Sequence, residues 1–503
     1  MIDRIVVLGG GSAGFIAAIS LKTKLPALRI TVIRSKELGI IGVGEGTTVS
    51  VPNYLHGFLN IDPMEFHRTV NPTFKLGIKF LWGPRPYFNY TFSPQFDMRY
   101  AALPRATGFY CQDDDESLKY AAPNSALMSL DKAFVRLQGG APGVRNDVAY
   151  HMENADFVGF LESHAQRLGV EIEDDTVADV EQDDRGITAL LGRSGKRHTA
   201  DLYVDASGFV SALLGKALNE PFVSFKSSLF CDRAVVGGWA RGPDEPIKPY
   251  TTAETMQSGW CWQIEHDNRI NRGYVYSSAF ISDDEAEREF RAKAPKVEAT
   301  RIVKFISGRY ARSWVKNVVA VGNACGFVEP LESTSLFVIC EESGNLAESL
   351  IECSRQPGPA MAGVYNRRVG RTWDDIRRFL AIHYRFNRRV DSEFWRACLE
   401  KTDLADAQDF VDYYVENGPS ARWGQNLVGG RDAFGFEGYL SMMVGMRVPH
   451  RRTYTISDAE RQTWAKIVEH NRAQAAAGVG MKESLEIIRS PHFKVKPGFY
   501  HYP

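Results

Sequence analysis

Three short segments of this chain hold the side chains best suited to chemistry. Lys75 stands in the apolar segment NPTFKLGIKF, Trp260 and Trp262 alternate along WCWQI, and Glu332 precedes three hydroxyl residues in FVEPLESTS. Burial would lower the pKa of a lysine below about 10.4 and make its neutral amine available. A glutamate can give or accept a proton. The segments predict acid–base chemistry, with an exposed strand lysine and a glutamate that complements a helix dipole as the alternatives.

A glycine-rich loop, GGGSAG at residues 9–14, lies between a predicted strand and a predicted helix. Residues 4–8 (RIVVL) predict a buried parallel strand, residues 15–25 a helix, and residues 30–33 a second strand. This order of elements is the dinucleotide-binding unit. Gly9 would allow the tight turn. Beyond it, Gly11 would let the backbone approach a pyrophosphate at the helix N-terminus, and Gly14 would permit close packing of helix on strand.

Further segments belong to the same cofactor domain. Residues 41–48 (IGVGEGTT) form a second glycine-rich loop, and residues 317–322 (NVVAVG) return the chain to the cofactor. Residues 201–208 (DLYVDASG) resemble the Asp-x-x-Gly element of FAD proteins of the hydroxylase type. The expected cofactor-binding residues are Gly9, Gly11, Ser12, Ala13, Gly14, Gly42, Gly44, Glu45, Asp205, Gly208 and Gly322.

The remaining patterns predict an α/β fold with two intimately joined parts. Residues 1–338 are expected to form a Rossmann-like FAD-binding core with β-rich, substrate-facing segments at about 75–130 and 220–285. A loop-heavy stretch is expected before residue 150. Residues 339–503 are expected to form a mainly helical substrate lobe, because helical periodicity dominates there.

The motifs, in this order, resemble the flavin-dependent tryptophan and indole halogenases from the first glycine loop to about residue 450. The resemblance implies FAD, used as FADH2, with O2 as co-substrate and chloride or bromide as the halide. Lys75 matches the family's catalytic lysine, whereas Lys79 lies at another position of the motif. Glu332 matches the acid that polarises the halogenating agent or accepts the proton of the ring.

The same resemblance implies how oxidised halide is kept apart from the organic substrate. Thr334 and Ser335 match the loop whose amides hold halide beside the flavin. The paired tryptophans match a W-x-W-x-I-P element that keeps the substrate away from the flavin. The expected substrate or tunnel residues are Tyr90, Phe92, Trp260, Trp262, Phe327, Pro330 and Ser333; for Tyr90 and Phe92, ordinary core packing is an equal alternative.

The chain departs from the family pattern at several points. Ser335 stands where tryptophan halogenases have glycine, which favours bromide over chloride, and Glu265 replaces the final proline of the tryptophan element. Arg34 ends the second strand, where an acid commonly binds the ribose of FAD, and Glu37 follows three residues later. Residues 417–445 lack the tyrosine pair of the family's substrate lid, so a simple indole, or an indole on a larger molecule, is favoured over free tryptophan.

Two other functions remain open at this point. A single-component flavin monooxygenase would oxygenate an aromatic substrate directly, and a non-catalytic homologue would only bind flavin. No second Rossmann unit for NAD(P)H is visible, so a separate NAD(P)H flavin reductase is expected as partner. The oligomeric state is expected to be a monomer or a homodimer.

Composition indicates which partners and which cellular compartment to expect for the protein. The formal net charge of −1 at pH 7 over 503 residues gives no electrostatic case for nucleic acid or an anionic membrane. No apolar run approaches the roughly 20 residues of a membrane span. The seven cysteines are scattered without a CxxC pair, which argues against disulfides and zinc and favours the cytoplasm. His151 is expected to be structural, and the acidic run at residues 113–116 a solvated loop; no metal site is expected.

Overall fold

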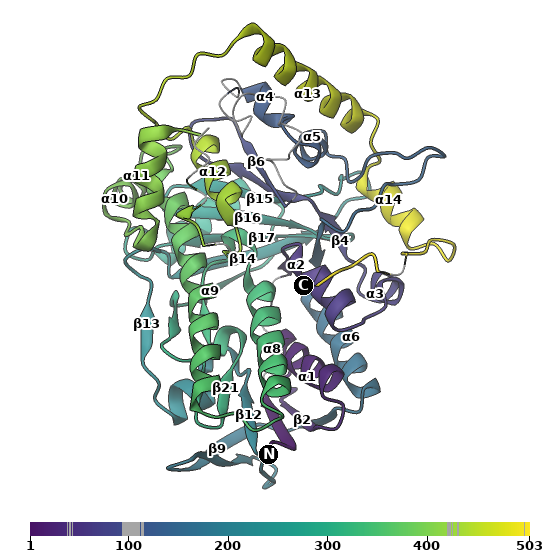
Figure 1. The fold of residues 1–503 in the computed structure, drawn as a ribbon, viewed down its shortest axis with the longest axis vertical. Coiled ribbons are helices and arrows are strands. Elements are labelled where there is room, and N and C mark those ends of the chain that lie inside the picture. Colours follow the sequence, from purple (N-terminus) through teal and green to yellow (C-terminus); the bar gives the residue numbers. More distant parts are fainter. Residues whose placement is uncertain are drawn as a thin grey trace.

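The computed structural model describes residues 1–37, 39, 42, 44–92, 111, 115–419, 424, 426–429, 432–496 and 498–502. The lower part of the molecule in Figure 1 is built on a six-stranded sheet in the order β20-β21-β12-β1-β2-β8. All neighbouring pairs are parallel except β20 with β21. The strands are β1 (Arg4–Leu8), β2 (Arg29–Arg34), β8 (Glu171–Asp174), β12 (Leu202–Asp205), β20 (Trp314–Val315) and β21 (Val318–Ala320).

Three helices accompany this sheet, and α1 (Ser12–Lys24) packs against both α6 (Asn154–Arg167) and α8 (Ser335–Glu352) (Figure 1). Residues 14–21 of α1 are all buried, so this helix is apolar on every side, as a helix enclosed by its neighbours should be. The glycine loop that opens α1 is thereby held against the ends of β1 and β2.

A seven-stranded sheet lies in the upper part of the molecule, in the order β18-β14-β17-β16-β15-β5-β6. Its pairs are antiparallel except β15 with β5. The strands are β5 (Gly77–Leu81), β6 (Phe88–Thr91), β14 (Arg233–Ala240), β15 (Thr251–Met256), β16 (Gly259–Glu265), β17 (Arg269–Tyr276) and β18 (Thr300–Lys304).

Three small sheets complete the strands, and one of them places site residues. In the order β3-β7-β4, the central strand pairs Glu45 with Met152 and Lys75 with Ala149. The small sheets comprise β3 (Glu45–Gly46), β4 (Thr73–Lys75), β7 (Ala149–Met152), β9 (Val177–Asp183), β10 (Gly186–Gly192), β11 (Arg197–His198), β13 (Phe222–Ser224), β19 (Gly308–Tyr310) and β22 (Gly326–Phe327).

From Ser335 onward the described elements are helices, and the long helix α9 runs beside α8 (Figure 1). The predicted division after residue 338 falls inside α8 (Ser335–Glu352). The division of the chain into two parts stays a prediction. The chain end returns to the N-terminal half, where Tyr502 packs edge-on to Tyr54 at 4.9 Å between ring centroids. The helices from α9 onward are α9 (Pro359–Phe386), α10 (Glu393–Lys401), η8 (Ala405–Ala407), α11 (Gln408–Asn417), α12 (Gly435–Gly445), α13 (Asp458–Ala476) and α14 (Met481–Ile488).

The predicted α/β fold is confirmed, and the strand at residues 4–8 has the predicted bounds. In the described part of the stretch before residue 150, short helices and strands alternate with loops. It contains α2 (Ser50–Asn53), η1 (Tyr54–Phe58), α3 (Pro63–Thr69), α4 (Asp115–Lys119) and α5 (Pro123–Ser129), besides strands β3 to β7. The remaining helical elements are η4 (Gly208–Val210), η5 (Ala212–Ala217), α7 (Asp283–Lys293), η6 (Gly322–Ala324) and η7 (Pro330–Glu332).

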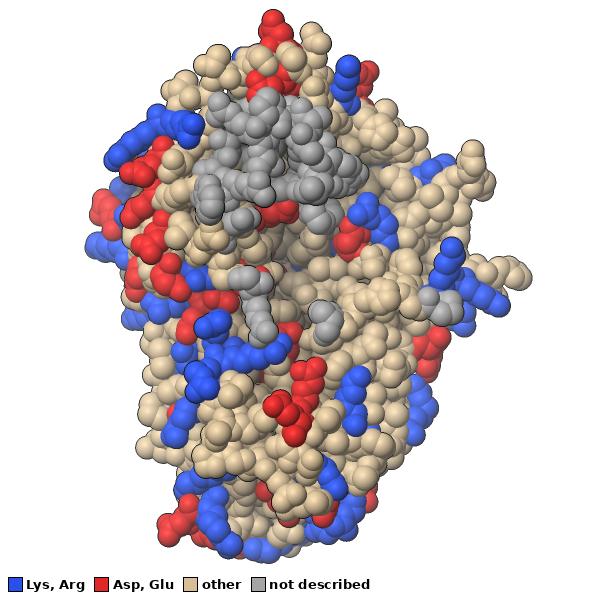
Figure 2. Space-filling model, viewed as in Figure 1, with Lys and Arg blue, Asp and Glu red and all other residues tan. Residues whose placement is uncertain are grey.

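Charges of both signs share one face of the molecule (Figure 2). On the face shown in Figure 2, basic and acidic side chains are interspersed, in keeping with the formal net charge of −1. Within the described ranges, every helix is too short or too polar to cross a membrane.

Candidate active site

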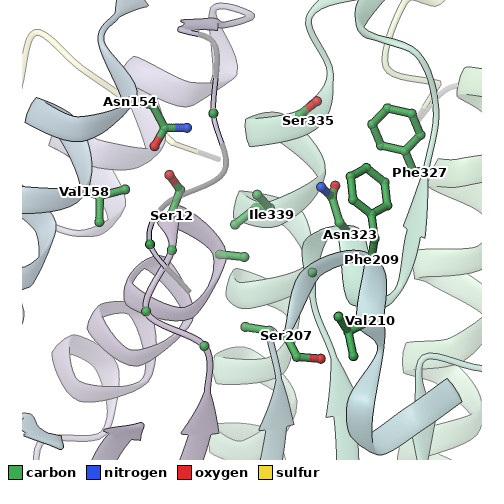
Figure 3. Close-up of a pocket in the computed structure, with 18 of the residues that line it drawn as sticks. Ser12, Asn154, Val158, Ser207, Phe209, Val210, Asn323, Phe327, Ser335 and Ile339 are labelled. Carbon is green, nitrogen blue, oxygen red and sulfur yellow. The ribbon is translucent and has the colours of Figure 1, made fainter. Parts of the chain in front are cut away.

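A cavity of about 1240 Å³, here called the first cavity, opens where the glycine loop meets the ends of β1 and β2. In Figure 3, Ser12 and Val158 lie on one side, and Ser335 and Phe327 on the other. Ligand sites for drug-sized molecules are commonly about 300–1,000 Å³. The first cavity is therefore large enough for a ligand bigger than most, such as a dinucleotide.

The glycines of the loop leave the space that their predicted roles require. Gly9 has a φ of +125°, and a Cβ there would lie 2.2 Å from the carbonyl oxygen of Ala206. A Cβ at Gly14 would lie 1.9 Å from the carbonyl oxygen of Gly9, so the helix can approach the loop only without a side chain. Gly11 lines the cavity with open space beside its Cα. A ligand can thus approach the backbone closely at Gly11.

The N-terminus of α1 suits a phosphate group. Gly11 occupies the N-cap position and no side chain caps the helix. The Ser12 hydroxyl is buried and has no hydrogen-bond partner among the described residues. Free amides and the helix dipole favour an anion there. The first cavity therefore fits the pyrophosphate of a flavin dinucleotide.

Most of the other predicted cofactor residues line the first cavity. They are Ala13, Gly42, Gly44, Glu45 and Gly208. The Glu45 carboxylate accepts a hydrogen bond from the Asn154 amide at 3.0 Å, and burial raises the pKa of Glu45 to about 7. A carboxyl that can be neutral near pH 7 therefore faces the cavity.

Asp205 and Gly322 lie behind the wall of the first cavity. The Asp205 carboxylate accepts hydrogen bonds from the amides of Leu213 and Leu214 at 2.8 and 2.9 Å. The Gly322 amide donates to the buried Glu342 at 2.6 Å, and the φ of Gly322 is +62°. Both residues shape the turns that carry lining residues and do not themselves line the cavity.

The segment from Pro330 to Ser335 divides the first cavity from a second one of about 180 Å³. Pro330, Ser333 and Ser335 line the first cavity, whereas Glu332 and Thr334 line the second. Ser333 adopts a left-handed conformation with a φ of +56°, which is uncommon outside glycine. The tight turn sends consecutive side chains to opposite sides, so one short segment serves both cavities.

Lys75 lies at this dividing segment. Its side chain is fully buried, and its amine donates to the Ser333 hydroxyl at 2.6 Å and to the Thr47 carbonyl at 3.0 Å. The amine also lies 5.2 Å from the ring centroid of Phe92, which lines the second cavity. Burial lowers the pKa of Lys75 to about 7, and the carboxyl of Glu332 opposes that shift.

Glu332 is buried and paired with a histidine. Its Oε1 lies 2.8 Å from Nε2 of His383, a residue of α9. The other ring nitrogen, Nδ1, lies 2.9 Å from the Phe379 carbonyl oxygen, which can only accept, so Nδ1 must carry a proton. The bond between Nε2 and Oε1 then needs one further proton, held by either group. Burial raises the pKa of Glu332, while His383 and then Lys75 lower it.

Lys75 and Glu332 do not form a direct ion pair. The amine bonds to Thr47 and Ser333, and the carboxyl bonds to His383. Each nevertheless shifts the pKa of the other towards the charged form. They are thus close enough to interact electrostatically across one turn of chain, and Glu332 lines the second cavity.

The second cavity is bounded by aromatic and acidic side chains. Tyr90 and Phe92 line one side, and Phe434 and Glu437 the other. The Phe434 ring stacks on Phe379 of α9, with ring centroids 3.9 Å apart and planes at 16°. Residues 420–423, 425, 430 and 431, which belong to the predicted lid region, lie outside the described residues.

The two tryptophans of β16 differ in their surroundings. Trp262 lines the first cavity, with Gly273 so close to its ring that a Cβ there would lie 2.4 Å away. Trp260 is fully buried, and its indole N–H donates to Glu329 at 2.6 Å. Burial raises the pKa of Glu329 to about 7, and the hydroxyl of Tyr384 also donates to this carboxyl.

The predicted halide residues sit at the start of α8. Thr334 is the N-cap, and no side chain caps the helix. Ser335, the first helical residue, lines the first cavity beside Phe327, as Figure 3 shows. A helix of 18 residues presents its free amides and positive dipole end here, which favours an anion.

The remaining candidates have structural partners. His151 bonds through Nε2 to the Thr251 hydroxyl at 2.8 Å, and Thr251 lines the first cavity. Asp115 in α4 pairs with Arg85 at 2.7 Å and Arg447 at 2.9 Å. Asp113 and Asp114 lie outside the described residues. In the described part of the chain, no group of three or more His, Cys, Asp or Glu residues could hold a metal ion.

Two residues of the site were not foreseen in the sequence. His383 lies 51 positions from Glu332, in the buried stretch 379–384 of an amphipathic helix, where a structural histidine is the ordinary interpretation. Glu329 precedes a proline three residues before Glu332, and the only signal for it was membership of the same segment. Both become visible only once α9 packs beside the dividing segment.

Comparison with known proteins gives consistent matches over most of the chain. The family model described as tryptophan halogenase matches residues 4–461. Tryptophan 7-halogenase KtzQ of Kutzneria sp. (strain 744) is 35% identical over 429 residues, which are 79% of this chain and 79% of that protein. Tryptophan 7-halogenase RebH of Lentzea aerocolonigenes is 31% identical over 441 residues, 82% of each chain.

A solved structure agrees with the fold. MibH, a lathipeptide tryptophan 5-halogenase, is 36% identical and superposes with a TM-score of 0.89, covering 97% of this chain and 93% of that one. The chain therefore belongs to the tryptophan halogenase family and is a flavin-dependent halogenase.

Proposed function

We propose that this enzyme attaches bromine or chlorine to an indole ring bound in the second cavity, through Lys75 and Glu332. The observation that carries the proposal is the fully buried amine of Lys75, which bonds to Ser333 of the first cavity and lies 5.2 Å from the ring centroid of Phe92 of the second. The substrate class follows the relatives, whose names assign them to tryptophan.

FAD fits the first cavity through the glycine loop and the N-terminus of α1. When bound and reduced, the flavin supplies, with O2, the oxidising power that turns halide into hypohalous acid. Trp262, Phe327 and Pro330 would close the cavity around it and keep the organic substrate out. Confinement is the main contribution of the protein, because free hypohalous acid reacts unselectively.

Lys75 would receive the oxidised halogen. With a pKa near 7, its amine is present in both protonation states at neutral pH. The ammonium can donate a hydrogen bond to hypohalous acid, and the neutral amine can form an N–halogen bond with loss of water. Thr47 and Ser333 hold the amine in place for either route.

Glu332 would handle protons during ring substitution. The ring carbon forms its bond to halogen while the oxygen–halogen bond breaks, and its electron pair stays on oxygen. That oxygen needs a proton to leave as water, and the ring then loses its own proton. The one proton shared by Glu332 and His383 can serve the first need, and the resulting carboxylate can meet the second. His383 is a positioning residue in this scheme.

Halide would bind at the N-terminus of α8, beside Thr334 and Ser335. The side chain of Ser335 restricts the backbone at a position where the tryptophan halogenase pattern has glycine. Bromide, which is more easily oxidised, is the favoured halide. This site lies on the wall between the two cavities, so hypohalous acid would travel only a short distance to Lys75.

A simple indole, or an indole carried on a larger molecule, is proposed as the substrate in preference to free tryptophan. The second cavity is small at about 180 Å³, and its described lining has the acids Glu332 and Glu437 and no Lys or Arg. The carboxylate of an amino acid would meet no cation there. Reduced flavin is proposed to come from a separate reductase, and the protein to act as a monomer or homodimer.

The test is product mass spectrometry after incubating indole with the enzyme, a flavin reductase, NADH, O2 and equimolar chloride and bromide. We expect haloindole, mainly brominated, and a lower kcat/KM for tryptophan than for indole. Hydroxylated product without halide would instead support a monooxygenase. No product from a protein that binds FAD would support a non-catalytic role.

A further inference from the structure

The adenosine end of the first cavity differs from the usual dinucleotide fold. Strand β2 ends at Arg34, and a Cβ at Gly10 would lie 2.3 Å from the Cβ of Arg34, so this residue abuts the glycine loop. In dinucleotide folds an acid at the end of the second strand accepts hydrogen bonds from the ribose hydroxyls. A guanidinium has only donors. An acceptor for the ribose must therefore come from another element.

Helix α6 brings a carboxylate to this place. Asn154, Val158 and Glu162 follow one another at four-residue intervals, which places them on one face of the helix, and all three line the first cavity. Figure 3 shows the first two on the α6 side of the cavity, on the same side as Ser12. The third lies one turn further on, beside the end of β2.

Arg34 and Glu162 form an ion pair at the cavity wall. Nη2 of Arg34 donates to Oε1 of Glu162 at 2.8 Å, and the two side chains are 20% and 25% exposed. A charge-assisted bond between half-buried groups fixes the orientation of the carboxylate. Its Oε2 is not engaged by any other described residue. One oxygen is therefore held by the protein, and the other is free to accept.

The other acids near the adenosine end each accept a hydrogen bond from a group other than Arg34. Asp175 accepts from Ser194 and Thr176, Asp179 from the amide of Val180, Asp174 from the amide of Lys36, and Glu37 from Arg193 at 65% side-chain exposure. Glu45 binds Asn154 and lies on β3, which pairs with the same strand as Lys75, at the other end of the cavity. Among the described acids that line the first cavity, Glu162 is the one bonded to Arg34, and its second oxygen is unused.

We propose that Glu162 binds the adenosine ribose of FAD, with Arg34 as the residue that positions it. The acceptor that other dinucleotide folds carry on the second strand has moved to the facing helix, and a basic residue on the strand now orients it. The inference rests on the proposed FAD site. It also implies a preference for a dinucleotide with free ribose hydroxyls over FMN, which has no adenosine.

The test compares flavin affinities of the full-length protein, measured by fluorescence titration of flavin-free enzyme with FAD and with FMN. Glu162→Gln keeps the shape of the side chain and removes its charge. Losing a hydrogen bond to a charged group should weaken FAD binding about ten- to a hundredfold and leave FMN binding unchanged. Asp156→Asn is the matched control, because it removes one negative charge from an exposed position of the same helix, away from the cavity, and should change neither affinity.

A second pair of variants tests the exchange of places. Arg34→Glu alone should weaken FAD binding, since two carboxylates then face each other. Arg34→Glu combined with Glu162→Gln returns a single acid to the strand end and should recover FAD affinity relative to Glu162→Gln. The inference is wrong if Glu162→Gln binds FAD as tightly as the wild type, or if FAD and FMN weaken equally. A wild type that binds FAD no better than FMN would also overturn it, whereas a wild type that binds neither flavin would remove the proposed function itself.

Discussion

The two cavities of this enzyme are built from different materials. The first is bounded at its phosphate end by backbone, where Gly9, Gly11 and Gly14 leave room that any Cβ would fill or narrow. The second is bounded by side chains from β6, the dividing segment and the region of α12. A backbone cradle recognises what all flavin dinucleotides share, whereas a wall of side chains can be altered residue by residue. Cofactor binding and ring halogenation should therefore be separable by mutation.

The largest separation is expected at Lys75. Lys75→Ala should lower the rate of haloindole formation by about 10³-fold or more, because the halogen loses its receiving amine. FAD affinity should not change, since this side chain does not line the first cavity. The measurement is turnover with indole, paired with FAD titration of the same sample.

Lys79→Ala is the matched control for Lys75→Ala. Its amine lies four residues away on β5 and donates to the Tyr250 hydroxyl at 2.8 Å, away from the dividing segment. Haloindole formation by this variant should stay close to wild type. Equal losses in the two lysine variants would contradict a specific role for Lys75.

The next effect is expected at the proton-sharing pair. Glu332→Gln should slow halogenation by about 10²-fold, as for loss of a general acid–base group. His383→Gln should cost less but shift the pH profile: His383 lowers the pKa of Glu332, so its removal should move the alkaline limb of kcat, where Glu332 loses the proton it donates, to higher pH. A slower His383→Gln enzyme with an unmoved alkaline limb would reduce His383 to a packing residue.

The buried amine of Lys75 should also make the free energy of unfolding depend on pH. The pKa of Lys75 falls from 10.5 to about 7 on folding, so between these pH values the unfolded chain binds more protons than the folded one. This group therefore makes the wild type more stable as pH rises. Lys75→Met should be more stable than wild type at pH 7, and the gap in the free energy of unfolding should shrink by about 1.4 kcal/mol per pH unit towards pH 10. Denaturant unfolding at several pH values measures it, and a gap that does not vary with pH would mean that the amine titrates normally.

The smallest effect is expected at Ser335. Ser335→Gly restores the residue of the family pattern and relaxes the backbone at the N-terminus of α8. The ratio of brominated to chlorinated indole, at equimolar halides, should fall by a few-fold while total turnover stays similar. An unchanged ratio would place the halide preference elsewhere.

The sequence predicted the first cavity better than the second for a physical reason. A glycine loop between a strand and a helix is a local pattern, and its consequence at residues 4–34 follows from sterics alone. The bond between His383 and Glu332 joins groups 51 residues apart, and that between Trp260 and Glu329 joins groups 69 apart. Such pairs depend on how α9 and β16 pack beside the dividing segment, which no local pattern encodes. The proposed move of the ribose acceptor to Glu162 depends likewise on the packing of α6 beside β2, although Arg34 already departed from the usual pattern.

Lys75 is proposed to pass oxidised halogen to the ring. The direct test is to follow where it goes in Lys75→Ala, using reductase, O2, bromide, indole and a small diffusible scavenger of hypobromous acid. We expect the variant still to oxidise bromide, with brominated scavenger appearing at close to the rate of bromide oxidation in the wild type, and with almost no bromoindole. Bromoindole formed by the variant at the wild-type rate and at a single ring position would contradict the claim.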